Sequence, residues 1–135
     1  MVGYSGTPLC KKLGWEPGMR VLLINAPQPY LDWLGESSAG VTFETMVQPP
    51  IEAVHLFTPD RAELETCLTT LRDQLAQSGV VWISWPKKAS RLPTDITEDV
   101  IRDVALPMGF VDIKVCAVSD IWSGLKLVIR KSERT

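Results

Sequence analysis

The sequence predicts an α/β three-layer sandwich with a mostly parallel sheet and an antiparallel hairpin at its C-terminal end. Three observations support this fold class. Unbroken apolar runs, such as Val21–Ile24, are typical of strands that are buried on both faces. Segments with apolar residues at helical spacing alternate with these runs. Two runs of alternating pattern, 111–117 and 125–130, close the chain and are expected to pair with each other.

Length and charge predict one globular domain over residues 1–135. The formal net charge of −2 argues against a dedicated nucleic-acid binder, which usually shows a basic excess. No apolar run approaches the ~18 residues of a membrane span. The first residues have neither the basic start nor the apolar core of a secretory signal. We therefore expect a cytoplasmic protein, with no nucleic-acid or membrane partner.

Turn residues and prolines divide the first half of the chain. Thr7-Pro8 is a suitable start for a helix, and Gly14 is a suitable end. The link between the strands Val41–Thr45 and Val54–Phe57 is short for a parallel crossover. Either that strand pair is misassigned or the crossover is a bare extended segment. The other expected elements are a strand over Arg20–Asn25 and a short helix over Tyr30–Leu34.

The second half is predicted to hold two amphipathic helices. The first begins after Thr58-Pro59-Asp60 and ends at Ser78-Gly79. Its continuous apolar stripe consists of Leu64, Cys67, Leu68, Leu71 and Leu75. The second helix is capped between Thr94 and Thr97 and ends at Pro107 and Gly109.

The cysteines and the single histidine give weak signals for chemistry. Cys10, Cys67 and Cys116 are odd in number and widely spaced, so we expect neither a disulfide framework nor a zinc site. His55 lies inside an apolar run. Two interpretations are open for it: a catalytic Cys–His pair, or, as we favour, a histidine whose hydrogen bonds are satisfied in the core or at its edge. We assign no catalytic residue, metal or cofactor.

The run Leu13–Leu23, which reads LGWEPGMRVLL, resembles the entry to the first strand of S-adenosylmethionine-dependent methyltransferases. The order of elements, ending in an antiparallel hairpin, is similar too. The resemblance implies a truncated, methyltransferase-like version of the Rossmann architecture. That family follows its first strand with an acidic residue and a Gly-x-Gly turn, whereas Ile24–Pro29 contains two prolines and no glycine. Family cofactor-binding residues are therefore not carried over to this loop.

Three further strings resemble a small family of bacterial proteins of unknown function. They are Tyr4–Leu9 (YSGTPL), Ser84–Ser90 (SWPKKAS) and Trp122–Ile129 (WSGLKLVI). This resemblance covers nearly the whole chain, but it brings no activity with it.

A ligand site is expected at the carboxyl ends of the parallel strands, where open α/β sheets bind ligands. The loop after Trp85 carries three positive charges shortly before a helix N-terminus, which favours an anion. Tryptophan side chains could offer a flat apolar wall. We predict a phosphate- or carboxylate-bearing small molecule here, with a solvated basic loop as the alternative. The candidate ligand-binding residues are Asn25, Trp85, Lys87, Lys88, Ser90, Arg91 and Trp122.

Three function classes remain open from the sequence. The leading hypothesis is a non-catalytic small-ligand or partner-binding domain with a degenerate methyltransferase-like fold. The second is a divergent S-adenosylmethionine-dependent methyltransferase that uses a different loop for its cofactor. The third is an interaction module that docks through exposed tryptophans. Ser84-Trp85-Pro86-Lys87 also fits the Ser-x-x-Lys pattern of penicillin-recognising enzymes, but a strand end followed by proline is the wrong geometry for it.

Overall fold

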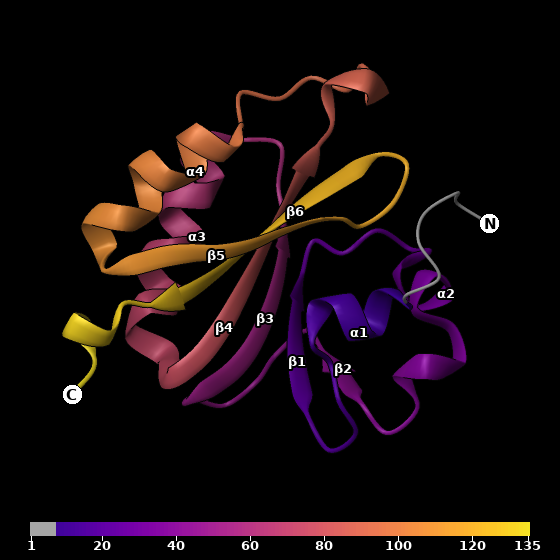
Figure 1. The fold of residues 1–135 in the computed structure, drawn as a ribbon, viewed down its shortest axis with the longest axis horizontal. Helices are drawn as coiled ribbons and strands as arrows, with labels where there is room; N and C mark the ends of the chain where they lie inside the picture. The colour runs from indigo at the N-terminus through magenta and orange to yellow at the C-terminus, as the bar shows by residue number, and fades with distance from the viewer. Residues whose placement is uncertain (1–7) are drawn as a thin grey trace.

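A computed structural model describes residues 8–135, which form a six-stranded sheet with helices on both faces (Figure 1). The strand order is β2-β1-β3-β4-β6-β5. β2, β1, β3 and β4 run parallel, and β6 is antiparallel to both β4 and β5. The strands are β1 (Arg20–Ile24), β2 (Thr42–Glu44), β3 (Ile51–Phe57), β4 (Leu75–Pro86), β5 (Phe110–Ala117) and β6 (Trp122–Ile129). The α-helices are α1 (Leu9–Leu13), α2 (Tyr30–Leu34), α3 (Arg61–Gln74) and α4 (Glu98–Ala105).

Two apolar cores, one on each face of the sheet, confirm the predicted three-layer sandwich. Trp82 and Ile83 are neighbours in β4, and they point to opposite faces because side chains alternate along a strand. Trp82 packs in the core beneath α1 and α2, and its indole N–H donates to the carbonyl of Leu13 at 2.9 Å. Ile83 packs in the core beneath α3 and α4.

The short link between β2 and β3 is resolved by the strand order. Both strands pair with β1, one on each side, so the connection crosses β1 without a helix. Its six residues, 45–50, contain no helix, and proline stands at its last two positions. This confirms the bare extended crossover and shows that the strand pair was assigned correctly.

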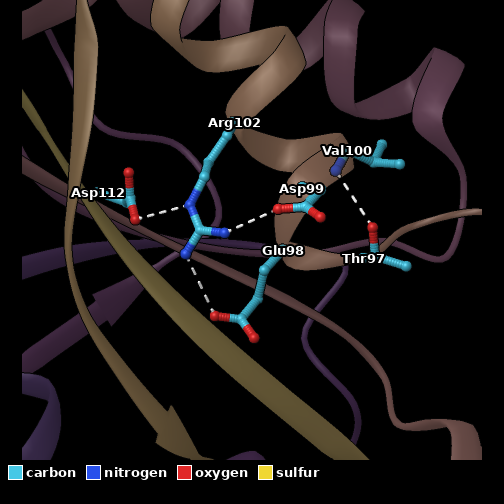
Figure 2. Close-up of polar contacts among 6 residues, drawn as sticks. All are labelled: Thr97, Glu98, Asp99, Val100, Arg102 and Asp112. Atoms are coloured by element: carbon cyan, nitrogen blue, oxygen red, sulfur yellow. Dashed lines mark hydrogen bonds and ion pairs between the residues drawn. The ribbon is translucent and has the colours of Figure 1, made fainter.

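Side-chain caps set the starts of the two long helices. Asp60 caps α3 by accepting a hydrogen bond from the N–H of Ala62 at 3.1 Å. Thr97 caps α4 by accepting from the N–H of Val100 at 3.2 Å, within the predicted interval (Figure 2). The carboxylate of Asp95 accepts from the N–H of Arg61 at 2.8 Å, so it serves the first turn of α3 and joins the two helix starts.

The end of α3 differs from the prediction. The helix stops at Gln74, and Leu75 is already extended and opens β4. A side chain at Gly79 would come within 2.5 Å of Leu75, so glycine here permits close packing inside a strand and does not end a helix. The expected cap at Thr7 lies outside the described residues. The longest described helix, α3, has 14 residues, and no helix within 8–135 has the length and hydropathy of a membrane span.

Candidate functional site

The parallel strands β1, β3 and β4 end at the same edge of the sheet. The strand order reverses at β1, because the chain continues to β2 on one side and to β3 on the other. Open α/β sheets bind ligands at such a reversal, outside the carboxyl ends of the strands. Two cavities lie along this edge. We call them the β1 cavity and the β4 cavity.

The β1 cavity has a volume of about 400 Å³, within the range of small-molecule sites. The loop after β1 forms most of it, and α2 and the end of β2 complete it. Its lining contains no charged side chain and consists of Leu23, Asn25, Ala26, Pro27, Gln28, Tyr30, Leu31 and Thr45.

The bend after β1 is made by Asn25, whose φ is +58°. Asparagine adopts this left-handed conformation more readily than other residues with a side chain, so it replaces the glycine that the resemblance led us to expect. Its side-chain amide donates to the Glu63 carboxylate of α3 at 3.3 Å. The N–H groups of Ala26 and Gln28 have no acceptor among the described residues. The loop therefore keeps two backbone donors, unpaired within residues 8–135, beside its prolines.

A buried chain of hydrogen bonds supports the wall of the β1 cavity. The indole of Trp15 donates to the Tyr30 hydroxyl at 3.0 Å, and that hydroxyl is hydrogen-bonded to Nδ1 of His55, 2.8 Å away. Nε2 of His55 is hydrogen-bonded to the Ser84 hydroxyl at 2.7 Å. Each ring nitrogen thus has a hydroxyl partner, and a hydroxyl can serve as donor or acceptor in either histidine tautomer.

Burial keeps this chain uncharged. It lowers the pKa of His55 to about 3 and raises the pKa of Tyr30 well above its ordinary value. Both histidine nitrogens are occupied, by Tyr30 and Ser84 and by no cysteine. His55 is therefore a satisfied core histidine, which confirms the favoured interpretation. Ser84 is fully buried in β4, which rules against its use as a penicillin-recognising nucleophile.

The β4 cavity has a volume of about 310 Å³. It lies between the end of β4 and the start of α4, with one residue from β6. Trp85 and Ile96, both buried, form its apolar floor. Its other lining residues are Pro86, Lys87, Lys88, Thr94, Thr97, Glu98 and Ser123.

The structure divides the predicted site. Trp85, Lys87 and Lys88 come together in the β4 cavity, whereas Asn25 belongs to the β1 cavity. Trp122 pairs in register with Pro86 and packs with Phe57, in the core on the opposite face from Trp85. The two tryptophans therefore do not form one wall.

The remaining two predicted residues line neither cavity. The Ser90 hydroxyl donates to the carbonyl of Lys87 at 2.6 Å and accepts from the N–H of Leu92, so it folds back onto its own loop. Arg91 is exposed and left-handed, with φ +62°. All five tryptophans are buried or half-buried, so the hypothesis of docking through exposed tryptophans finds no exposed ring.

Sequence reasoning missed the residues that approach the cavities from other elements. Tyr30 and Leu31 come from α2, and Thr45 follows β2. Thr94 and Ile96 precede α4. The end of the second strand is a known position for ribose contacts in this architecture, so Thr45 could have been found from that rule.

Comparison with solved structures shows a methyltransferase-like, Rossmann-like α/β fold. No family model and no curated protein matches the sequence. A protein assigned to the type 11 methyltransferases of Sulfolobus solfataricus is 14% identical, with a TM-score of 0.63 over 94% of this chain and 92% of that one. Magnesium protoporphyrin IX methyltransferase from Synechocystis PCC 6803, solved with bound S-adenosylmethionine, is 12% identical, with a TM-score of 0.57 over 91% and 74%. A protein of the NADB-Rossmann superfamily from Streptococcus agalactiae is 12% identical, with a TM-score of 0.54 over 100% and 73%.

These matches correct one expectation. The sequence favoured a non-catalytic domain over an enzyme. That preference is contradicted by the solved structures of similar fold, which include methyltransferases and a pericyclic reaction enzyme. The preference for a non-catalytic domain rested on the absence of glycine from this loop. Asn25 supplies the bend that glycine would otherwise make. The resemblance to the bacterial family and the cytoplasmic location stay predictions.

Proposed function

We propose that the chain is a divergent S-adenosylmethionine-dependent methyltransferase that holds its cofactor in the β1 cavity. The observation that carries this proposal is the cavity of about 400 Å³ at the point where the strand order reverses. The likeness of the fold to methyltransferases supports it.

The lining of the β1 cavity suits this cofactor. When bound, S-adenosylmethionine supplies an electrophilic methyl group on a positively charged sulfonium. An uncharged lining does not repel that charge, whereas the lysines of the β4 cavity would. Leu31 and Pro27 offer apolar surface for a flat base, and Asn25 and Thr45 offer polar groups.

Two features of the chain decide which groups would hold the polar ends of the cofactor. The free N–H groups of Ala26 and Gln28 suit a carboxylate, which accepts hydrogen bonds from backbone donors. Glu44, at the end of β2, stands where Rossmann folds place a ribose-binding acid. Its carboxylate accepts a hydrogen bond from Arg20 at 2.6 Å, and Glu44 does not line the β1 cavity, so the ribose contacts are left to Thr45 and Asn25.

Titration calorimetry with S-adenosylmethionine tests the proposal. Leu31 is 54% exposed, so Leu31→Arg places bulk and positive charge at the cavity without disturbing the core. We expect the wild type to bind and this variant to lose affinity by about tenfold or more. Leu92→Arg is the matched control, because Leu92 is similarly exposed, at 46%, and lines neither cavity. The proposal fails if the wild type does not bind, or if both variants lose affinity equally.

A further inference from the structure

We infer that the β4 cavity binds the methyl acceptor, and that this acceptor is a small molecule with a flat apolar body and a carboxylate or phosphate group. The inference rests on the proposed methyltransferase function and names the substrate class for it. Its basis is an imbalance of charge at the cavity, together with the apolar floor described above.

The positive charges of the β4 cavity are not neutralised within the protein. Lys87 and Lys88 make no ion pair with any carboxylate of the described residues. Glu98 is the only acid in the lining, and its carboxylate faces Arg102 at 3.4 Å (Figure 2). The cavity thus keeps two uncompensated cations beside one acid that already has a partner.

Arg102 keeps this imbalance in place. Its guanidinium also reaches Asp99 and Asp112, each at 3.0 Å, and so ties α4 to β5 (Figure 2). These contacts hold the guanidinium among two acids of its own helix, Glu98 and Asp99, and one acid of β5, Asp112. An arginine held in this way attracts Glu98 away from the lysines and leaves them available to an anion.

The apolar floor of the β4 cavity favours an apolar body in the ligand. Trp85 and Ile96 line the cavity and are 7% and 2% exposed. Apolar walls with a few polar groups at the rim are typical of small-molecule sites. A ring on this floor, with its anionic group at the lysines, satisfies both parts of the lining.

The position of the cavity fits an acceptor. β3 alone separates β1 from β4 in the sheet, which places the two strand ends about 10 Å apart. The β1 cavity lies toward the α2 face and the β4 cavity toward the α4 face. A ligand anchored at Lys87 and Lys88 would have to extend past the end of β3 to reach the cofactor.

Calorimetric titration with phenyl phosphate, benzoate and phenol tests this inference on the full chain. We expect phenyl phosphate or benzoate to bind, and uncharged phenol to bind about tenfold more weakly. The variant Lys87→Ala/Lys88→Ala should lose about tenfold or more in affinity for the anionic probe. Arg91→Ala is the matched control, since it removes a charge from the same loop but not from the cavity, and it should change affinity less than about twofold.

The outcomes separate this inference from the proposed function. It is overturned if the wild type binds neither anionic probe, if the double variant binds like the wild type, or if Arg91→Ala loses as much affinity as the double variant. Binding of S-adenosylmethionine is measured on the same proteins and should not weaken in the double variant. If the anionic probe binds and S-adenosylmethionine does not, the anion site stands and the methyltransferase function fails.

Discussion

The two cavities lie at the same sheet edge but are built in opposite ways. The wall of the β1 cavity is locked from behind by a buried, uncharged chain through Tyr30 and His55. The rim of the β4 cavity carries Lys87, which is half-buried, and Lys88, which is exposed, and neither has an ionic partner among the described residues. The first has a wall held by buried hydrogen bonds, and the second offers charge on half-buried and exposed side chains. Under the proposed function, the first would hold an invariant cofactor and the second a more variable acceptor.

The largest effect should come from breaking the wall of the β1 cavity. Tyr30 is 1% exposed, so Tyr30→Ala leaves a void and two orphaned hydrogen-bonding partners. We expect a loss of about 3–5 kcal/mol in the free energy of unfolding. Lys88→Ala at the other cavity should change it by less than about 0.5 kcal/mol. Urea denaturation measures both, and similar losses would contradict the contrast between the two cavities.

Tyr30→Phe is a milder change that keeps the ring and removes only the hydroxyl. It should cost about 1–3 kcal/mol, because the indole of Trp15 and Nδ1 of His55 lose their partner without a void. A loss as large as that of Tyr30→Ala would assign the effect to the hydrogen bonds alone.

Acid should weaken the buried chain specifically. The unfolded chain protonates His55 near pH 6.5, whereas the folded protein holds its pKa at about 3, so the unfolded state gains a proton that the folded state refuses. Stability therefore falls as the pH drops below 6.5, by about 2 kcal/mol between pH 6.5 and 5. Comparing urea midpoints of the wild type and His55→Gln isolates this contribution. An equal pH slope in the variant would show that His55 is not its source.

The bend at Asn25 should have a smaller effect. Asn25→Ala forces a left-handed conformation on alanine and should cost about 1 kcal/mol. Asn25→Gly loses the same hydrogen bond to Glu63 but carries no such strain, so it should be more stable than the alanine variant. Thermal unfolding and S-adenosylmethionine titration of the pair measure the value of this bend. Equal stability of the two variants would show that the bend stores no strain.

The smallest effect should come from Arg102→Gln, which frees the Glu98 carboxylate beside the lysines. We expect affinity for phenyl phosphate to fall by about threefold at most, since exposed charges interact weakly. High salt should remove the difference. An unchanged affinity at low salt would show that Glu98 does not compete with the ligand.

Local patterns predicted most of the fold. The apolar run Val80–Ile83 of β4 and the cap interval of α4 could be predicted because each depends on neighbouring residues. The end of α3 could not be predicted in this way, because Leu75 continues the helical spacing of apolar residues although it belongs to β4. Only its pairing with Ile51 across the sheet decides between the two.

The site was harder to predict, because it depends on register and on contacts between distant elements. Trp85 lies near the end of β4 and Trp122 begins β6, at the same edge of the sheet. The register pairs Trp122 with Pro86, so the two tryptophan side chains lie on opposite faces. A shift of one residue reverses the face of a side chain, and sequence does not reveal that shift. The link from Tyr30 to His55 likewise joins two segments whose proximity is set by the packing of α2 on the sheet.

The buried hydrogen-bond chain from Trp15 to Ser84 has an evolutionary consequence. Each side chain in it supplies a hydrogen-bond partner to the next. An indole N–H can only donate, so tryptophan fits only at the end of such a chain. Replacing Tyr30 by phenylalanine leaves Nε1 of Trp15 and Nδ1 of His55 without a partner in the buried core. We therefore expect substitutions at these positions to occur together. Homologous sequences should therefore retain this quartet whole or trade it for a wholly apolar set.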